Sequence, residues 1–357
     1  MKLNKWLTLF LVLTLAMTMV LSACGTKDEG TKEPKEETPA EQPAEQPAEE
    51  TALNVAMVTD LGGVNDNSFN QSAWEGLQQL NADTGINVDY IESQSDADYV
   101  PNLSRFVKEG KDLTWGIGFL MEDSIRDVAN QNQDSKLAII DSDLSGDIPA
   151  NVTPVLFKEQ EGSFLVGVVA AKMTETGKIG FIGGMEIPVI KRFEAGFVQG
   201  VKAVNPDLQP IVIYTGAFNA PDKGKQAAAT MFDQGADIVF HAAGATGDGL
   251  FGEVKERRDK GEKVWAIGVD RDQSITFGDE VTLTSMVKRV DEAVYQVSKD
   301  LSEGKWNGGE VVHLGLAENG VGLPAENPNI SEDVLAEVES YKEKIVNGEI
   351  TVAETLE

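Results

Sequence analysis

Short apolar runs alternate with longer amphipathic segments along most of the chain. Residues 55–58 form an apolar run that ends at Thr59 and Asp60, passes a polar turn, and enters a segment with apolar residues at helical spacing. The pattern then repeats, which predicts strands at residues 53–59, 86–91, 113–119 and 137–140, with helices at 69–81, 99–108 and 123–130. Repeated β-α-β order requires parallel strands joined by right-handed crossovers, with helices on both faces of the sheet.

The same rhythm starts again after Asp141. It predicts strands at residues 178–182, 209–214, 237–240 and 264–269, with helices at 162–173, 189–204, 223–232 and 249–259. The last quarter predicts strands at 282–287 and 311–316 and helices at 291–301 and 332–346. Two such runs indicate two similar α/β domains.

This order resembles the two-lobe type I periplasmic-binding-protein fold, which has parallel sheets flanked by helices and a ligand cleft between its lobes. In that architecture the chain crosses between the lobes three times. We therefore expect lobe 1 at residues 53–150, lobe 2 at 151–278, and returning segments at 279–357 that complete lobe 1. The expected crossings lie near Asp147–Pro154, near Phe277–Glu280, and between Val287 and Leu323.

The N-terminus has the pattern of an export signal. Lys2 and Lys5 precede an apolar stretch at residues 6–21, and the sequence LSACG follows. That sequence is similar to a bacterial lipobox, which predicts a signal peptide at residues 1–23 and lipidation of Cys24. Residues 24–52 are rich in Glu and Pro and predict a disordered acidic tether. We expect the protein at the cell membrane, lipid-anchored on the extracytoplasmic face.

Composition excludes several classes of function. The formal net charge of -29 argues against nucleic acid as a partner, because polyphosphate binding needs clusters of Lys and Arg. Cys24 is the only cysteine, so neither an intrachain disulfide nor a cysteine metal cluster can form. With 357 residues the chain is long enough for two domains with substantial cores.

Acidic and aromatic residues follow the predicted strands. Because the carboxyl ends of parallel strands meet at a ligand site, these residues are expected to converge in the cleft between the lobes. A carboxylate can accept hydrogen bonds from both hydroxyls of a ribose, and a flat base fits between aromatic faces. The residues at these strand ends are Asp60, Asn65, Asp66, Phe69, Phe119, Asp123, Asp141, Phe218, Gly244, Asp270 and Lys288.

Four sequence blocks resemble the basic membrane protein family, whose PnrA-like members are purine-nucleoside-binding lipoproteins of ABC importers. The blocks are VTDLGGVNDNSFNQSAWEGL at residues 58–77, AAGATGDG at 242–249, AIGVDRDQ at 266–273 and TSMVKRVD at 284–291. The resemblance extends from residue 53 to about residue 323. It implies a nucleoside such as adenosine, guanosine or inosine as ligand, and the permease subunits of an ABC importer as partners.

The resemblance also implies roles for individual residues. It places the base between Phe69 and Phe218, with Asn65 and Asp66 near its polar edge. It assigns the ribose hydroxyls to Asp270 and Lys288, with backbone presented by Gly244. Asp123 would close the other side, although Asp141 can fill a similar place. The single cation among the acidic residues of the cleft, Lys288, would lower their mutual repulsion, and such a site suits a neutral ligand.

Partial matches to cofactor and metal motifs do not favour an enzyme. Residues 247–252 match the GxGxxG pattern of dinucleotide sites, but an exported lipoprotein has no expected supply of NAD. Asp141 begins a calcium-like loop that has Val152 where a bidentate Glu is needed. Neither His241 nor His313 has a second ligand at metal spacing, and no GxSxG or HExxH is present.

We therefore expect no enzyme activity, no metal and no cofactor, and predict a substrate-binding lipoprotein that captures a nucleoside by closure of its cleft. The alternatives are a binding protein for a sugar or another small polar ligand, and a nucleoside-processing enzyme.

Overall fold

The structure is a computed structural model that describes residues 53–356. The expected signal peptide, the lipidation site Cys24 and the tether at 24–52 lie outside the described residues. Residues 51–357 form a compact unit of their own, which holds two complete sheets and their hydrophobic clusters. This unit therefore has the parts of an independently folding domain.

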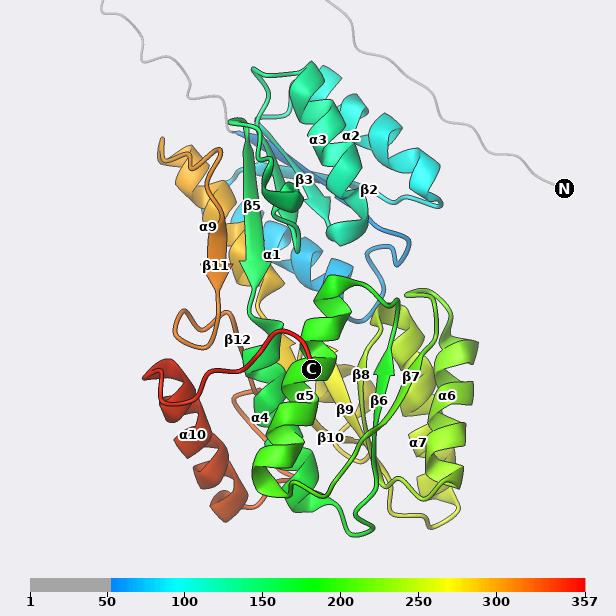
Figure 1. Ribbon diagram of the computed structural model, residues 1–357. Helices are drawn as coiled ribbons and strands as arrows, with labels where there is room; N and C mark the ends of the chain where they lie inside the picture. Colours follow the sequence, from blue (N-terminus) through cyan, green and yellow to red (C-terminus); the bar gives the residue numbers. More distant parts are fainter. Residues whose placement is uncertain (1–52, 357) are drawn as a thin grey trace, which may run out of the picture. The chain divides into compact units, whose positions relative to one another are not determined.

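Two six-stranded sheets define two α/β lobes (Figure 1). In lobe 1 the strand order is β11-β5-β4-β3-β1-β2, and every neighbouring pair is parallel. In lobe 2 the order is β12-β10-β9-β8-β6-β7, and only the β10–β12 pair is antiparallel. The strands are β1 (Asn54–Thr59), β2 (Asn87–Ile91), β3 (Leu113–Ile117), β4 (Leu137–Ile140), β5 (Val152–Phe157), β6 (Ile179–Gly183), β7 (Ile211–Tyr214), β8 (Ile238–Ala242), β9 (Trp265–Asp270), β10 (Thr282–Lys288), β11 (Val312–Leu314) and β12 (Val321–Gly322). The predicted two-lobe fold with parallel sheets is confirmed.

Helices cover both sheets. Those of lobe 1 are α1 (Phe69–Thr84), α2 (Tyr99–Lys108), α3 (Glu122–Gln131) and α9 (Val290–Ser302). Those of lobe 2 are α4 (Glu159–Met173), α5 (Pro188–Val204), α6 (Pro221–Asp233), α7 (Asp248–Asp259), α8 (Ser274–Phe277) and α10 (Glu332–Val346). Helix α1 extends three residues beyond the predicted end at residue 81, and it stops at Thr84 because Gly85 adopts the left-handed conformation with φ 75°.

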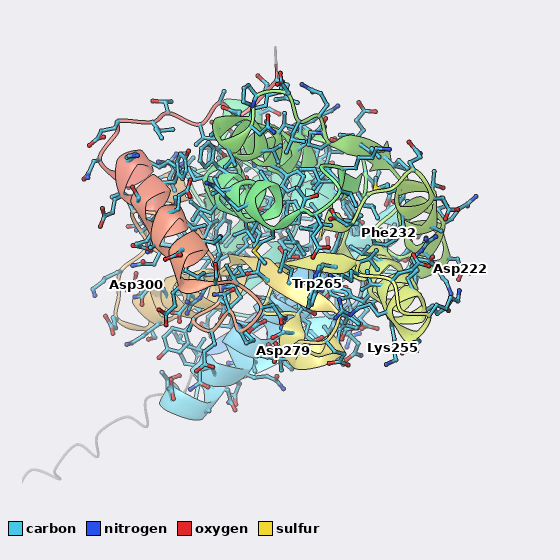
Figure 2. The ribbon with its side chains drawn as sticks, turned by 90° about the horizontal axis from the view of Figure 1, so that it is seen from below. Asp222, Phe232, Lys255, Trp265, Asp279 and Asp300 are labelled. Carbon is cyan, nitrogen blue, oxygen red and sulfur yellow. The ribbon has the colours of Figure 1, made fainter. Side chains whose placement is uncertain are left out.

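The two cores are apolar and aromatic. In lobe 1 Trp115 is fully buried, and its indole N–H donates to Ser298 Oγ at 3.0 Å. In lobe 2 the rings of Phe181, Phe197 and Phe240 contact one another with centroids 5.2–6.1 Å apart. Figure 2 shows charged side chains such as Asp222 and Lys255 at the periphery, and both are exposed. Aromatic packing therefore fixes the strands behind the cleft.

The crossings between lobes differ from the expected boundaries. Strand β5 at 152–157 pairs with β4 in lobe 1, so the first crossing follows Phe157 rather than residues 147–154. Strand β10 pairs with β9 in lobe 2, so the second crossing follows Lys288 rather than residues 277–280. The third crossing lies between β11 and β12, within the expected range. Lobe 2 therefore extends from about residue 159 to residue 288, and it also includes β12 and α10.

Pro154 explains why the sequence pattern does not predict strand β5. A proline inside an apolar run argues against a central strand, because it has no N–H to donate. Here β4 pairs with β5 along residues 152–155, while β11 on the other side begins to pair only at Val155. Pro154 therefore stands where β5 is still an edge strand on one side, and the missing donor is tolerated.

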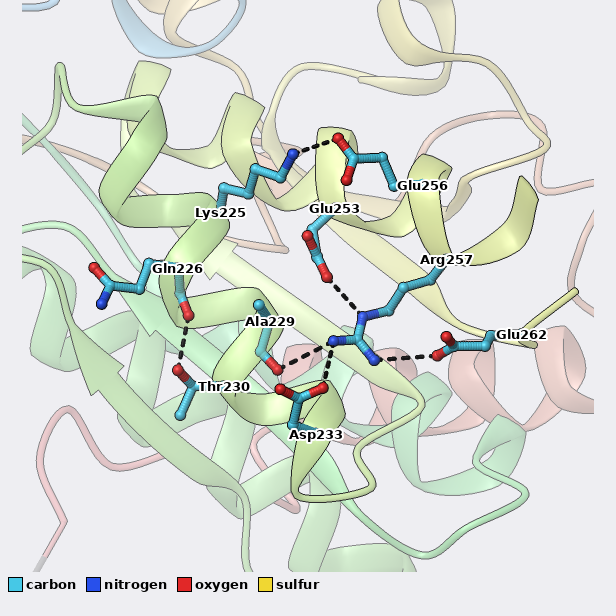
Figure 3. A network of polar contacts seen from close by, with 9 residues as sticks. All are labelled: Lys225, Gln226, Ala229, Thr230, Asp233, Glu253, Glu256, Arg257 and Glu262. Carbon is cyan, nitrogen blue, oxygen red and sulfur yellow. Dashed lines mark hydrogen bonds and ion pairs between the residues drawn. The ribbon is translucent and has the colours of Figure 1, made fainter. Parts of the chain in front are cut away.

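A network of charges joins α6 to α7 (Figure 3). The guanidinium of Arg257 contacts Asp233 at 2.6 Å, Glu253 at 2.7 Å and Glu262 at 3.1 Å, and its side chain is only 13% exposed. Lys225 pairs with Glu256 on the same helix pair. Arg257 is thus the shared cation of three carboxylates that lie on two helices and the following loop.

We expect Arg257→Ala to lower the free energy of unfolding by about 2 kcal/mol, because it leaves the carboxylate of Glu253, which is only 10% exposed, without its cation. Urea denaturation of residues 51–357 measures the loss. Lys263→Ala is the matched control, because Lys263 and its partner Glu175 are 78% and 70% exposed. The control should cost less than about 0.5 kcal/mol. An equal cost for both variants would contradict the role of Arg257.

Candidate ligand-binding site

A cavity of about 60 Å³ lies between the carboxyl ends of the two sheets. Lobe 1 lines it with Asp60, Gly62, Asp66, Phe69, Asn70, Gly118, Phe119, Leu120 and Asp141. Lobe 2 lines it with Ile187, Val189, Ile190, Phe193, Phe218, Ala242, Ala243, Gly244, Val269, Asp270 and Lys288. Both lobes therefore contribute polar and aromatic side chains to one cavity.

The loop between β1 and α1 is fixed by two aspartates. Asp66 Oδ1 accepts hydrogen bonds from the backbone N–H groups of Ser68 and Gln71, both at 3.0 Å, and Oδ2 accepts one from that of Asn70 at 2.9 Å. Asp66 thus caps the first turn of α1 with its whole carboxylate. The Asn70 side-chain amide also bridges Asp66 and Asp60, donating to Asp60 Oδ1 at 2.7 Å.

Asp60 is the carboxylate of this loop that remains available to a ligand. Its Oδ1 accepts from Gly62 N and Asn70 Nδ2, whereas no described residue donates a hydrogen bond to Oδ2. Burial raises the pKa of Asp60 to about 6, although the hydrogen bonds from Gly62 and Asn70 act in the opposite direction. Asp60 can therefore offer a hydrogen-bond acceptor to the cavity at neutral pH.

A chain of alternating charges runs from the cavity into lobe 2. Lys288 Nζ lies 2.7 Å from both carboxylate oxygens of Asp141 and 3.0 Å from Glu159 Oε1, and Glu159 Oε2 accepts from Arg192 Nε at 2.6 Å. Lys288 is 1% exposed and Glu159 is fully buried. Since each buried charge has an opposite partner, the chain of four is neutral as a whole.

The neighbouring charges keep this chain ionised. Burial alone lowers the pKa of Lys288, but the carboxylates of Asp141, Glu159 and Asp270 outweigh it and hold that pKa above its usual value. Burial raises the pKa of Glu159, yet Lys288 and Arg192 bring it below its usual value. Burial raises the pKa of Asp141 to about 6 in spite of the lysine.

Asp270 stands at the end of β9, next to the end of β10 that carries Lys288. It accepts a hydrogen bond from Ser68 Oγ of lobe 1, and burial raises its pKa to about 7, although Lys288 lowers it. Both Asp270 and Asp141 have left-handed backbone, with φ 64° and 70°. This conformation is uncommon for residues other than glycine, and such strain concentrates at functional sites.

Aromatic rings form the walls of the cavity. Lys288 Nζ lies 5.1 Å from the ring centroid of Phe69 and 5.6 Å from that of Phe193, within the range of cation–π contacts. Phe218 packs so closely on Gly184 that a Cβ there would stand 2.4 Å from the ring. A side chain at residue 184 would collide with Phe218, so glycine there allows the ring to pack against the backbone.

Six of the eight residues expected at the ligand site line the cavity: Asp66, Phe69, Phe218, Gly244, Asp270 and Lys288. Asn65 does not, because it is exposed in the turn while Asp66 turns inward to cap α1. Asp123 does not either. Its side chain is 90% exposed at the start of α3 and pairs with Arg126 at 2.6 Å. The structure brings Asp141 to the cavity in its place.

Besides Asp141, four polar or aromatic residues outside the expected ligand set line the cavity: Asp60, Asn70, Phe119 and Phe193. Glu159 contacts Lys288 without lining the cavity. The positions of Asp60 and Phe119 at the ends of predicted strands were the available signal. Asn70 and Phe193 lie within helices, and helical periodicity alone does not mark a residue as part of a ligand site. Glu159 precedes the predicted start of its helix, so no pattern connected it with Lys288.

Other chemistry has less support in the described part of the chain. Residues 53–356 contain no group of three or more His, Cys, Asp or Glu placed to hold a metal ion. His241 is fully buried, and burial lowers its pKa to about 4, while its Nε2 lies 2.8 Å from Gln273 Oε1. Among these residues no helix is both long and apolar enough to span a membrane.

A cavity at facing strand ends, lined by both lobes, is typical of a two-lobed small-molecule-binding protein. The family model described as ABC transporter substrate-binding protein PnrA-like matches residues 53–355. The chain belongs to this family of substrate-binding proteins. As such it binds a small molecule for an ABC transporter, with the permease subunits as partners.

Similar proteins include two bacterial proteins and one solved structure. The chain is 44% identical to the CD4+ T-cell-stimulating antigen of Listeria monocytogenes, over 98% of this chain and 99% of that protein. It is 39% identical to the ABC transporter nucleoside-binding protein BmpA of Lactococcus lactis, over 84% and 89%. An ABC transporter solute-binding protein from Aeropyrum pernix K1 is 32% identical with a TM-score of 0.78, over 85% and 94%.

Proposed function

We propose that this protein captures a nucleoside, with a purine nucleoside favoured, by closure of its two lobes. The observation that carries the proposal is the convergence of phenyl rings and carboxylates from both lobes on one cavity. Phe69 and Phe218 supply flat apolar surfaces for a base. Asp60, Asp141 and Asp270 supply acceptors for N–H and O–H donors. The name of the Lactococcus lactis relative, a nucleoside-binding protein, supports the same reading.

The two ends of the site suit different parts of a nucleoside. Asp270 projects from β9 beside Lys288 of β10, and a carboxylate next to an ammonium can bind a ribose diol through both acceptor and donor contacts. Asp60 lies on lobe 1, where its Oδ2 can accept from an exocyclic or ring N–H of the base. Several carboxylates against one cation disfavour a phosphate, so the proposed ligand is neutral.

The size of the cavity indicates that the lobes must move during binding. The cavity of about 60 Å³ is far smaller than the 300–1,000 Å³ that ligand sites usually offer. Entry of a nucleoside therefore requires the lobes to separate, and the ligand then stabilises a closed form to the extent that it binds this form better.

Membrane attachment is a second part of the proposal. The lipobox-like LSACG sequence supports lipidation of Cys24 and a position on the extracytoplasmic face of the cell membrane. Metabolic labelling with a radioactive fatty acid tests this, with Cys24→Ser as the control. Label that persists in the Cys24→Ser variant would contradict it.

A thermal-shift screen of residues 51–357 tests the ligand class, because a bound ligand raises apparent stability by mass action. The screen contains nucleosides, free bases, nucleotides and pentoses. We expect stabilisation by one or more nucleosides and none by the matching nucleotides. Stabilisation by a sugar alone would replace the proposal with the sugar-binding alternative, and conversion of nucleoside to base during the assay would indicate an enzyme.

Replacing Phe218 by Ala should weaken nucleoside binding by about 1–3 kcal/mol, because stacking of one base on an aromatic ring is worth this much. Isothermal titration calorimetry measures the change. Tyr90→Ala is the control, because Tyr90 is 39% exposed on β2 and lies outside the cavity. An unchanged affinity of Phe218→Ala for every nucleoside would show that this ring does not stack on the base.

A further inference from the structure

Two consecutive residues of lobe 1, Asn67 and Ser68, are held at three points by lobe 2. The backbone oxygen of Asn67 accepts a hydrogen bond from Gln273 Nε2 at 3.0 Å. Asn67 Nδ2 donates to Asp248 Oδ2 at 3.0 Å, and Ser68 Oγ donates to Asp270. We call these five residues the interlobe latch. Its bonds join residues that are about 180 to 206 positions apart in the chain.

Gln273 is pre-oriented for this contact by the interior of lobe 2. Its Oε1 accepts from Val269 N at 2.9 Å and lies 2.8 Å from His241 Nε2, and its own backbone N–H donates to Ser285 Oγ at 3.1 Å. Because Val269 N can only donate, the amide oxygen must face it and the amide NH₂ must face Asn67. The neutral His241 then carries its proton on Nε2. Gln273 is fully buried, so this donor has one defined direction.

The latch residues of lobe 1 lie between the residue that caps α1 and a residue that lines the cavity. Asp66, immediately before it, caps α1, and Phe69, immediately after it, lines the cavity. Asn67 itself has left-handed backbone with φ 54°, a conformation that asparagine tolerates better than most residues. Separation of the lobes would break all three latch hydrogen bonds at once, whereas those within the Asp66 cap would persist.

We propose that Asn67, Asp248 and Gln273 are positioning residues that determine how long the protein retains its ligand. They lie outside the cavity lining and connect the lobes only when these are together. The latch therefore slows reopening while leaving the approach of ligand to the open form unchanged. A net hydrogen bond contributes about a tenfold factor in an equilibrium constant. The inference rests on the proposed function in one respect, since the retained ligand is taken to be a nucleoside.

The first experiment measures release of radiolabelled inosine from residues 51–357 after a chase with excess unlabelled inosine. Asn67→Gly removes the side-chain donor and keeps the left-handed backbone free of strain. Asp248→Ala removes the acceptor. We expect each variant to raise the dissociation rate constant about tenfold. The association rate constant should not fall, because neither change removes the open form that admits the ligand. The double variant should release inosine no faster than the faster single variant, because both changes remove the same bond.

A matched control separates the latch from a general effect of glycine. Asn347→Gly replaces an exposed asparagine at the end of α10, which lies outside both the cavity and the latch. It should leave both rate constants unchanged. Equal melting temperatures of Asn67→Gly and the unmodified protein would show that the faster release is not due to lost stability.

The second experiment needs no ligand and distinguishes failure of the latch from failure of the nucleoside proposal. Residues 51–357 contain no cysteine, so spin labels can be attached at Asp127→Cys on α3 and Lys260→Cys after α7, both exposed positions. Pulsed electron resonance then measures the distance between lobes. We expect Asn67→Gly to shift the distribution to longer distances. An unchanged distribution together with an unchanged release rate overturns the latch, whereas a longer distance without any nucleoside binding supports it and refutes the nucleoside.

Discussion

Replacing Lys288 with methionine is expected to lower the free energy of unfolding of residues 51–357 by about 3–5 kcal/mol, the usual cost of breaking a buried ion pair. The change keeps most of the apolar stem and removes the ammonium. Asp141 and Glu159 would then be buried without the cation that lies 2.7 Å and 3.0 Å from them. Arg192 would remain beside Glu159, but Asp141 would lose its only ion-pair partner within the described residues. Urea denaturation at pH 8 measures the loss.

The cost of Lys288→Met should depend on pH in a defined direction. Without the lysine, burial raises the pKa of Asp141 further, and a group whose folded-state pKa is raised contributes stability at low pH that is lost as the pH rises. The variant should therefore lie closer to the unmodified protein at pH 5 than at pH 8. The double variant Asp141→Asn, Lys288→Met should lose less free energy of unfolding than the sum of the two single variants. Each single change leaves the other charge buried without a partner, whereas the double change removes both charges.

Lys172→Met provides the matched control for this experiment. Lys172 pairs with Glu337 at 2.6 Å, as short as the Lys288 contacts, but these side chains are 32% and 38% exposed. Water can solvate the glutamate that remains, so the control should cost less than about 1 kcal/mol. If Lys288→Met costs no more than Lys172→Met, the prediction that Lys288 stabilises buried Asp141 and Glu159 is wrong.

Much of the architecture was readable from the sequence because it depends on local periodicity. Three observed elements have the bounds that the sequence predicts: helix α2 at 99–108, strand β4 at 137–140 and helix α10 at 332–346. Strand ends converge in any parallel sheet, so Phe69, Phe218 and Asp270 could be assigned to one site without knowledge of the helices between them. These inferences need only the order of elements and the direction of the strands.

What escaped prediction depends on side-chain direction and on contacts between distant segments. Asn65 and Asp66 are adjacent in an irregular turn, and no periodicity indicates which of them faces inward. The pairing of Glu159 with Lys288 joins two chain crossings that are far apart in sequence. Asp141 lines the cavity with left-handed backbone. Glycine is the residue that usually indicates this conformation, so an aspartate did not predict it. Geometry of this kind is set by tertiary structure.

The Asp270→Asn variant is expected to bind nucleoside about 100- to 10,000-fold more weakly at pH 8, since it weakens or loses two charge-assisted hydrogen bonds worth about 1.5–3 kcal/mol each. An amide offers one acceptor where the carboxylate offers two, and it carries no charge. The measurement is calorimetric titration with the nucleoside that the thermal-shift screen identifies. The control is Asp123→Asn, because Asp123 is exposed on α3 and outside the cavity. Equal affinities of Asp270→Asn and unmodified protein would remove Asp270 from the site.

The pH profile tests the same assignment independently. The pKa of Asp270 is raised to about 7 by burial, and donation from two ligand hydroxyls would lower it in the complex. Affinity should therefore rise as the pH increases from 6 to 8, because binding favours the ionised form. In Asp270→Asn this rise should be lost, and what remains should follow Asp60 and Asp141, whose pKa values are raised to about 6. An unaltered profile in the variant would assign the titration to another group.

Stability should change in the opposite direction to affinity. A carboxyl with a raised folded-state pKa contributes stability that is present below its unfolded value near 3.8 and is lost as the pH rises through about 7. At pH 8 the ligand-free protein therefore bears the cost of a buried charge at Asp270, and Asp270→Asn should be the more stable protein in urea denaturation. A residue that weakens the fold and strengthens binding is what a site preorganised for a ligand requires. A variant that lost both affinity and stability at pH 8 would instead mark Asp270 as a structural anchor for Ser68.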